Sequence, residues 1–357
     1  MPAPSVPEGP DALTIEWLSA ALSRPVEAFD VEPLGTPGGL VGRLVRLAIR
    51  YPGSRQGPAR LVAKFSAEDG WAHALFDKVG LYERETRFYL DIAPRGGSYA
   101  PACHYAAYDP DQHRSVLLLD ESPAPGWPDL GDEDIMRLVR AIARYHARWW
   151  DDPLIASFDW MPGIMSGNAE AGAEVLAEAW HIWRERVGAV LPSPFRDVVE
   201  AYVASMSRVR GALEESPRTV LHFDFHVGNV LLWPGARDVA PTFIDSCPVY
   251  GRGVYDVAHF GLVSLSPERR RGLEARMVDA YHVTLLERGV TGYSRARCDE
   301  DYRLSVLAVM HRVLLSTMVV LRMEHPDGEA VAMGIARQFS EAAAQHDLVS
   351  LCGAYRT

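Results

Sequence analysis

Residues 220–260 read VLHFDFHVGNVLLWPGARDVAPTFIDSCPVYGRGVYDVAHF. Near the start of this segment, two apolar runs enclose four polar side chains within eight residues: His222, Asp224, His226 and Asn229. Asp and Asn are common in turns, where their side chains bond to nearby backbone groups. The combination of imidazole, carboxylate and amide groups at this density nevertheless favours a functional cluster.

Two carboxylates of the segment predict different roles. Asp245 ends the strand-like run TFI and, together with the amide of Asn229, offers the oxygen ligands that Mg²⁺ prefers. Asp224 lies five residues before Asn229, far enough to face an incoming hydroxyl instead of the metal. This division of labour indicates phosphoryl transfer, in which positioning and charge neutralisation supply most of the catalysis.

The composition of the chain is that of a globular protein. Of its 357 residues, 48% are hydrophobic and 23% are charged, which excludes a mostly disordered chain. The net charge of −11 argues against a non-specific binder of nucleic acid or of an anionic membrane. His311 and Arg312 interrupt the apolar run Leu304–Leu321, so we expect a buried helix there and no membrane span. The N-terminus carries no signal pattern, and we therefore expect a soluble, cytoplasmic protein.

The order of elements predicts an α+β fold with two lobes, residues 1–121 and 122–357. In the first lobe we expect a short helix and then an antiparallel sheet that carries one main helix, over 77–94. A connector rich in Pro, Gly and Asp follows at 122–134. In the second lobe the apolar spacing predicts three short strands within 219–245 and helices over 132–150, 169–190, 194–215, 266–289, 300–323 and 327–346.

HFDFHVGN (222–229) resembles the H-x-D-x-H-x-x-N motif of the aminoglycoside phosphotransferase and choline kinase-like families, which share the bilobal protein-kinase fold. IDSCP (244–248) takes the place of the I-D-W motif of these families. The resemblance extends over most of the chain through four further segments: LVAKFS (61–66), ERETRFYLDIAP (83–94), SVLLLDES (115–122) and ARYHARWWDDP (143–153). In these families they correspond to the strand with the nucleotide lysine, the helix with its acidic partner, the strand that enters the hinge and the helix after it.

The resemblance implies a nucleotide site in the first lobe. Lys64, one of only two lysines in the chain, would contact the α- and β-phosphates. Glu85 would orient Lys64 through an ion pair, since the E-x-x-F-Y pattern favours Glu85 over Glu83. Gly38 and Gly39, in the turn over 35–42, would lie over the phosphates. The residues that would offer backbone groups to the nucleotide base are Asp120, Glu121 and Ser122.

The resemblance also implies the catalytic and metal-binding residues. Asp224 would accept the proton of the substrate hydroxyl or orient that hydroxyl, and Asn229 and Asp245 would hold Mg²⁺. The residues that would hold the catalytic loop together are His222, His226 and Asp256.

Three features depart from the family pattern. Phe223 stands where the families carry glycine, in the motif H-G-D. Ser246 replaces the tryptophan that follows the metal-binding aspartate. The turn GTPGGLVG (35–42) differs from G-x-G-x-x-G. These departures indicate a divergent branch.

We therefore expect a phosphotransferase that moves the γ-phosphoryl group of ATP or GTP to a hydroxyl of a small molecule. An antibiotic or related natural product is the expected acceptor, with resistance as the outcome, and choline or another metabolite is the alternative. A metal-dependent hydrolase that uses His222, Asp224 and His226 as ligands is an alternative of another class, and a nucleotide-binding pseudokinase is a third.

The tryptophans between 149 and 183 fit either core packing or an aromatic wall for the substrate. The choice between ATP and GTP and the oligomeric state are left open.

Overall fold

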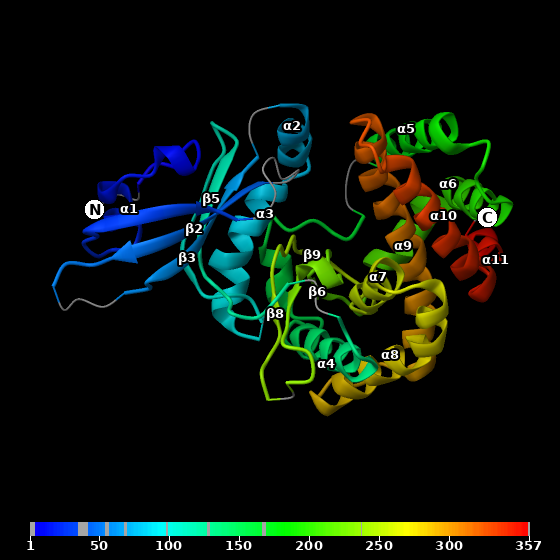
Figure 1. Ribbon diagram of the computed structural model, residues 1–357. Coiled ribbons are helices and arrows are strands. Elements are labelled where there is room, and N and C mark those ends of the chain that lie inside the picture. The colour runs from blue at the N-terminus through cyan, green and yellow to red at the C-terminus, as the bar shows by residue number, and fades with distance from the viewer. Residues whose placement is uncertain are drawn as a thin grey trace. The chain divides into compact units, whose positions relative to one another are not determined.

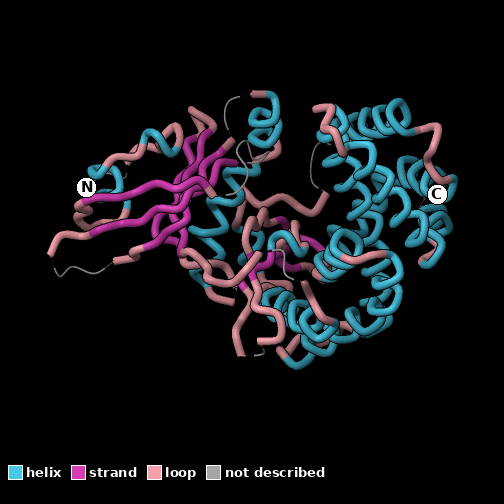
Figure 2. The backbone as a smooth tube through the Cα atoms, viewed as in Figure 1, coloured by secondary structure: helices cyan, strands magenta, loops and turns pink. Residues whose placement is uncertain are grey.

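The computed structural model describes residues 4–34, 42–53, 57–67, 70–97, 99–126, 129–165, 169–236 and 238–355. The chain forms two compact units: Met1–Pro128 with Gly228–Pro248, and Asp129–Val227 with Val249–Thr357. Figures 1 and 2 show the sheet of the first unit and the helices of the second. Residues 228–248 thus group with the first unit, although they fall within the second predicted lobe. The roles assigned to the predicted lobes, 1–121 and 122–357, stay predictions.

The first unit contains a five-stranded antiparallel sheet in the order β1-β2-β3-β5-β4. The strands are β1 (Ala28–Pro33), β2 (Gly42–Arg50), β3 (Arg60–Ser66), β4 (Cys103–Asp109) and β5 (Arg114–Asp120). One face of the sheet packs in a core that includes Leu18 of α1 (Ile15–Ala21). On β3 the buried Ala63 and Phe65 belong to this core, so the alternation of the strand turns Lys64 toward the opposite face. A short 3₁₀ turn, Pro10–Ala12, precedes α1.

The predicted continuous helix over 77–94 is wrong, because the chain divides this region into shorter elements. These are α2 (Trp71–Lys78), α3 (Leu81–Arg87), a π turn (Phe88–Ile92) and a 3₁₀ turn (Ala93–Arg95). Gly80 separates α2 from α3 with a φ of 69°, in the left-handed region that only glycine adopts without steric cost. This break sets the direction of α3, which carries Glu85 and lies beside the sheet in Figure 1.

The second unit is mostly helical, as predicted. Its main helices are α4 (Asp132–Arg148), α5 (Ala169–Val187), α6 (Ser193–Glu214), α7 (Val254–Ser264), α8 (Pro267–Glu287), α9 (Arg295–Arg322), α10 (Gly328–Gln345) and α11 (Leu348–Ala354). A 3₁₀ turn, Pro153–Ser157, follows α4. The strands β6 (Thr219–Leu221) and β9 (Val249–Gly251) form a small antiparallel pair. Ser266 caps α8, because its Oγ accepts a hydrogen bond from the Arg269 N–H. α9 begins at Arg295, earlier than the predicted start near residue 300.

α9 contains the apolar run that the sequence predicts to be a buried helix. By length and composition alone this helix could cross a membrane, and 72% of its most apolar window is buried inside the protein. Trp183 packs in the same region and donates from its indole N–H to the carbonyl of Leu314 (3.1 Å). Trp149, Trp180 and Trp183 are all buried, so packing explains these three tryptophans.

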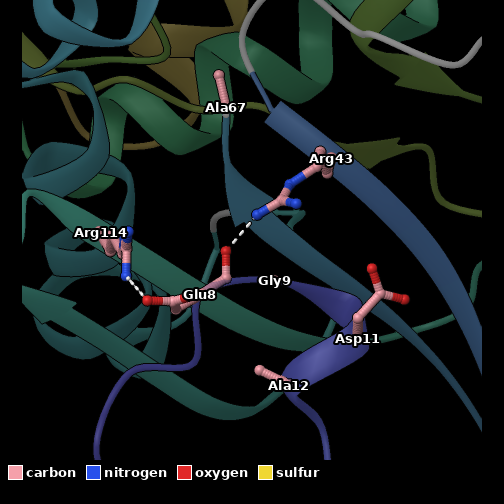
Figure 3. Close-up of a pocket in the computed structure, with 7 residues that line it drawn as sticks. All are labelled: Glu8, Gly9, Asp11, Ala12, Arg43, Ala67 and Arg114. Carbon is pink, nitrogen blue, oxygen red and sulfur yellow. Dashed lines mark hydrogen bonds and ion pairs between the residues drawn. The ribbon is translucent and has the colours of Figure 1, made fainter. Parts of the chain in front are cut away.

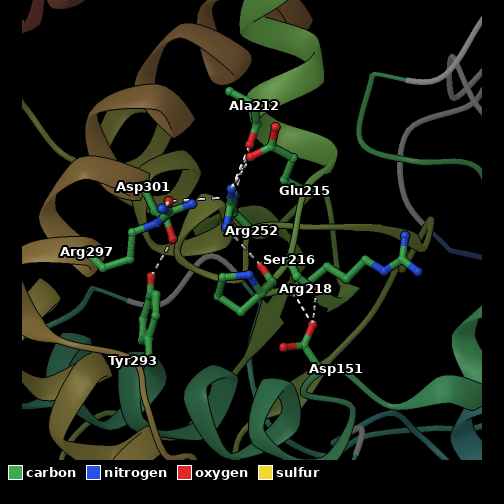
Figure 4. A network of polar contacts seen from close by, with 10 residues as sticks. Asp151, Ala212, Glu215, Ser216, Arg218, Arg252, Tyr293, Arg297 and Asp301 are labelled. Atoms are coloured by element: carbon green, nitrogen blue, oxygen red, sulfur yellow. Dashed lines mark hydrogen bonds and ion pairs between the residues drawn. The ribbon is translucent and has the colours of Figure 1, made fainter.

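A buried arginine ties together the segments that lead into α7. Arg252 donates to the carbonyl of Ala212 at the end of α6 (2.8 Å) and lies 3.6 Å from the carboxylate of Asp301 on α9. Figure 4 shows these contacts, and the Arg252 side chain is fully buried. Because Arg252 comes two residues before the start of α7, this network fixes the beginning of the helix that carries Asp256.

Replacing Arg252 with Met should lower the free energy of unfolding by about 3 kcal/mol, because backbone acceptors and Asp301 would lose a buried cationic partner. Urea denaturation followed by circular dichroism measures this change. Arg297→Met is the matched control: Arg297 also binds Asp301 (3.0 Å) but is 40% exposed, so we expect a loss below about 1 kcal/mol. Equal losses in the two variants would contradict the anchoring role of Arg252.

Candidate active site

Lys64 is the centre of an ion-pair cluster in the first unit, in which Glu85 is buried, Lys64 is nearly buried and Asp245 is 44% exposed. Its Nζ lies 2.6 Å from Oε1 of Glu85 on α3 and 2.8 Å from Oδ1 of Asp245. Burial opposes the charge on Lys64, but the two carboxylates outweigh it and raise the pKa of Lys64 above its ordinary value. Glu83, the other candidate partner, lies beside Arg87 instead (3.8 Å). The cluster thus joins three residues that are far apart in the sequence and that the motifs single out.

A short hairpin brings Asn229 next to Asp245. β7 (Val230–Leu231) pairs with β8 (Thr242–Phe243), and the ladder continues through a hydrogen bond from the Ile244 N–H to the Asn229 carbonyl (3.1 Å). The residue after Ile244 is Asp245, whose φ of 58° is in the left-handed region. For a residue other than glycine this conformation costs of order 1 kcal/mol and is concentrated at ligand sites. The amide and carboxylate oxygens expected at a magnesium site are therefore held by one hairpin.

The residues predicted to meet the nucleotide base lie at the end of β5. The backbone N–H of Asp120 is bonded to the carbonyl of Ala102 (2.8 Å), and the Asp120 carboxylate contacts His104 (2.6 Å). The Glu121 side chain accepts from Arg46 (2.6 Å), and Ser122 Oγ accepts from the N–H of Ala124 (3.3 Å). The Asp120 N–H is thus already used in a hydrogen bond within the fold. Gly38 and Gly39 lie outside the described residues.

In the second unit, Asp256 holds the backbone of the predicted catalytic loop. Its fully buried carboxylate accepts from the N–H groups of His222 (2.8 Å) and Phe223 (3.0 Å). It also contacts Nε2 of His146 on α4 (3.0 Å), and His146 Nδ1 contacts the hydroxyl of Tyr281 on α8 (3.0 Å). Burial opposes ionisation of Asp256, but these donors outweigh it and lower the pKa of Asp256. Asp256 therefore supports the loop from its backbone.

Asp224 has three basic neighbours in the second unit. Arg312 on α9 forms an ion pair with Asp224, with 2.6 Å between Nη2 and Oδ1. Nε2 of His259 on α7 lies 3.7 Å from Oδ1, and Nε2 of His226 lies 3.8 Å from Oδ2. Burial raises the pKa of Asp224, but the charge of Arg312 and the hydrogen-bonding contact with His226 hold it well below its ordinary value. The carboxylate is therefore ionised at neutral pH.

His259 is a neutral member of this group. Its Nδ1 contacts the carbonyl of Phe225 (3.0 Å), which makes Nδ1 the protonated nitrogen and leaves Nε2 directed toward Asp224. Burial, and after it the nearby charge of Arg312, lower the pKa of His259 to about 4.

The alternative of a metal-dependent hydrolase requires a ligand group made of His222, Asp224 and His226. His222 is buried, and its ring packs on Phe225 at 5.9 Å between centroids. Across the part of the chain that the structure describes, no group of three or more His, Cys, Asp and Glu side chains is arranged to hold a metal ion.

Three residues that contact the predicted set were not predicted from the sequence: His146, His259 and Arg312. His146 and His259 lie within the quoted segments 143–153 and 220–260 but were not singled out there, whereas Arg312 reaches Asp224 from a helix remote in sequence that no motif marks. The sequence feature that could have identified such a residue is a polar side chain within a mostly apolar helix, such as Arg312 within the run 304–321.

A separate hollow of about 420 Å³ lies on the first unit (Figure 3). It is lined by Glu8, Gly9, Asp11, Ala12, Arg43, Ala67 and Arg114. Arg114 pairs with the Glu8 carboxylate (2.9 Å), and Arg43 donates to the Glu8 carbonyl. None of the predicted site residues lines this hollow, and its two arginines are used in holding the N-terminal segment.

No known protein family and no curated protein matches the chain by sequence. Solved structures do match it. The GDP complex of aminoglycoside 2′-phosphotransferase-IIIa has a TM-score of 0.55 and 15% identity, over 88% of this chain and 93% of that one. Choline kinase from Cryptosporidium parvum has a TM-score of 0.56 and 9% identity, over 92% and 94%. A thermostable mutant of aminoglycoside phosphotransferase APH(4)-Ia, in complex with ADP and hygromycin B, has a TM-score of 0.53 and 12% identity, over 93% and 99%.

These matches cover nearly the whole chain and identify its fold. The chain has the α+β fold shared by aminoglycoside phosphotransferases and choline kinases, with the antiparallel sheet in one unit and the helices mainly in the other. The fold class and the structural resemblance predicted from the sequence are confirmed.

Proposed function

We propose that the protein is a magnesium-dependent phosphotransferase that moves the γ-phosphoryl group of ATP or GTP to a hydroxyl of a small molecule. The observation that carries this proposal is the ion-pair cluster of Lys64, Glu85 and Asp245. A lysine held by two carboxylates is oriented and charged, as a ligand for phosphate oxygens must be. The alternative of a metal-dependent hydrolase leaves this cluster unexplained.

The residues present fit a magnesium ion. Asn229 and Asp245 would hold it, since both are brought together by one hairpin and both supply hard oxygen ligands. A bound ion would neutralise charge on the phosphate oxygens during transfer. Lys64 would bind the α- and β-phosphates, and Glu85 would keep the ammonium group in place. Glu121 and Ser122 would offer backbone groups to the base.

Asp224 would act on the acceptor. As the acceptor oxygen forms its bond to the γ-phosphorus, the bond from that phosphorus to the nucleoside diphosphate breaks. The hydroxyl proton passes to Asp224, and the diphosphate leaves with the electron pair of the broken bond. Because Asp224 is ionised and weakly basic, its main contribution is to orient the hydroxyl and to take up the proton late in the transfer.

The acceptor we propose is a hydroxylated antibiotic or related natural product, modified in the cytoplasm where nucleoside triphosphates are present. A phosphoryl group adds about two negative charges and would disrupt a close, hydrogen-bonded contact between a drug and its target. One structural neighbour is an aminoglycoside phosphotransferase solved with ADP and hygromycin B, which supports this class. Choline is the alternative acceptor, supported by the likeness to a choline kinase.

The test is direct transfer. Purified protein, Mg²⁺ and ATP or GTP labelled on the γ-phosphate are incubated with aminoglycosides, macrolides, nucleoside antibiotics, choline and ethanolamine, and the products are analysed by mass spectrometry. We expect a labelled phosphoryl group on a hydroxyl of one compound class. Phosphorylated choline without any phosphorylated antibiotic would select the metabolite kinase. Release of the label to water alone, with every acceptor unmodified, would contradict transfer to these compounds.

A further inference from the structure

Phe223 is strained and bulky where the resembled families carry glycine. Its φ of 71° is in the left-handed region, which costs a side-chain-bearing residue about 1–2 kcal/mol and costs glycine nothing. The two backbone N–H groups that Asp256 binds, those of His222 and Phe223, hold this conformation. Glycine would adopt this backbone conformation without steric cost. The contacts of the Phe223 ring must therefore offset the cost that its side chain brings.

The Phe223 ring contacts two side chains from different helices. It stacks on Tyr255 of α7, with 5.4 Å between ring centroids and 20° between the planes. The guanidinium carbon of Arg312 lies 4.4 Å from the Phe223 centroid, in the range of a cation–π contact. Phe223 thus provides a flat surface on which the Arg312 side chain rests.

Arg312 connects this surface to the neighbouring carboxylate. It is carried by the otherwise apolar centre of α9, and its Nη2 lies 2.6 Å from Oδ1 of Asp224. The guanidinium is therefore held on two sides, by an aromatic ring and by the carboxylate of the next residue in the loop. An arginine suits both contacts because its planar cation stacks on rings and binds carboxylates directionally.

We propose that Arg312, resting on the Phe223 ring, is a positioning residue that fixes the Asp224 carboxylate toward the acceptor hydroxyl. This inference rests on the proposed function. The ion pair restricts rotation of the carboxylate, so its oxygens keep one direction while the acceptor binds. It also explains the replacement of glycine by Phe223, since glycine would leave Arg312 without its ring contact.

The groups that face Asp224 predict a measurable consequence. They are Arg312 from α9, His259 from α7 and His226 from the same loop. Among them Arg312 is the closest to Asp224, and its charge favours the ionised carboxylate most. Removing this cation leaves burial to favour the protonated form, so the pKa of Asp224 must rise.

The experiment titrates Asp224 in the full-length protein labelled with ¹³C at aspartate carboxyl carbons. Asp224→Asn identifies its resonance. In Arg312→Gln we expect the Asp224 pKa to rise by roughly one unit or more, and in Arg312→Lys and Phe223→Leu by less. Arg322→Gln is the matched control on the same helix, where Arg322 pairs with Glu178 (2.9 Å), and it should leave the Asp224 pKa unchanged.

Kinetics on the same variants separate positioning from simple packing. With Mg²⁺ and ATP or GTP, and water as acceptor, kcat should fall roughly 100-fold in Arg312→Gln while KM for the nucleotide stays the same. Arg312→Lys should recover part of kcat. Melting temperatures confirm that each variant is folded, and the conservative Lys variant keeps the test open if the Gln variant does not fold.

The titration and the kinetics each support or overturn the positioning role of Arg312. Titration of Asp224 over the same pH range in wild type and in Arg312→Gln would overturn the proposal, and so would a shifted pKa with an unchanged kcat. If the pKa shifts but the wild type turns over neither nucleotide, with water or with any of the acceptors named above, the contact of Arg312 with Asp224 is supported while the phosphotransferase function is overturned.

Discussion

Asp224→Asn should reduce phosphoryl transfer roughly 1,000-fold, because the amide keeps the shape of the carboxylate but cannot take the hydroxyl proton. Nucleotide binding should be nearly unchanged, since Lys64, Asn229 and Asp245 are intact in this variant. Steady-state kinetics with the acceptor found by mass spectrometry measure the first effect. A thermal melt with nucleotide and Mg²⁺ measures the second.

The matched control is Asp197→Asn, which removes an exposed carboxylate on α6 and should leave transfer unaffected. Turnover of Asp224→Asn within a few fold of the wild type would remove Asp224 from the reaction. If both transfer and nucleotide binding were lost together, the variant would have damaged the fold, and Asp224→Glu would then be needed to separate the two effects.

Lys64→Met should weaken nucleotide binding by roughly 10- to 100-fold, the usual value of a charge-assisted contact to phosphate.

Lys64→Met should also destabilise the fold by about 3 kcal/mol at neutral pH, because Glu85 remains buried beside Asp245 without its cation. Burial and Asp245 both raise the pKa of Glu85, and Lys64 is the group that opposes them. The pKa of Glu85 is already raised in the wild type, and without Lys64 it rises further above the unfolded value. The free energy of unfolding of the variant is therefore retained at low pH, where Glu85 is protonated, and it falls as the pH rises through the folded-state pKa of Glu85.

Urea denaturation at pH 5 and at pH 8 tests this pH dependence. We expect the free energy of unfolding of Lys64→Met to fall further below that of the wild type at pH 8 than at pH 5. Lys78→Met provides the control, since Lys78 is the only other lysine and is exposed at the end of α2. The account of the nucleotide site would be wrong if Lys64→Met kept a wild-type response to nucleotide.

Local spacing marked part of the candidate site. The interval from Asp224 to Asn229 and the run TFID are short-range patterns, whereas the hairpin that joins Asn229 to Asp245 was found only in the structure. The ion pair of Lys64 with Glu85 was implied by the family resemblance, and the structure contains it. The antiparallel sheet was predicted from alternation and turn residues, which are also short-range patterns.

Long-range packing explains what the sequence did not predict. Arg312 reaches Asp224 only because α9 packs near the loop, and a side chain in an apolar helix gives no sign of its partner. The break at Gly80 depends on a left-handed backbone angle that spacing alone does not reveal. Residues 228–248 join the first unit through tertiary contacts, although their position in the chain suggests the second lobe.

The most direct measurement is a thermal melt of the wild-type protein with ATP or GTP, each with and without Mg²⁺. A nucleotide at about 100 times its dissociation constant should stabilise the fold by about 2.7 kcal/mol, which is a visible shift of the melting temperature. We expect at least one nucleotide to raise the melting temperature in a way that depends on Mg²⁺, and we expect a smaller increase in Lys64→Met. The absence of any shift with either nucleotide would contradict the roles assigned to Lys64, Asn229 and Asp245 together.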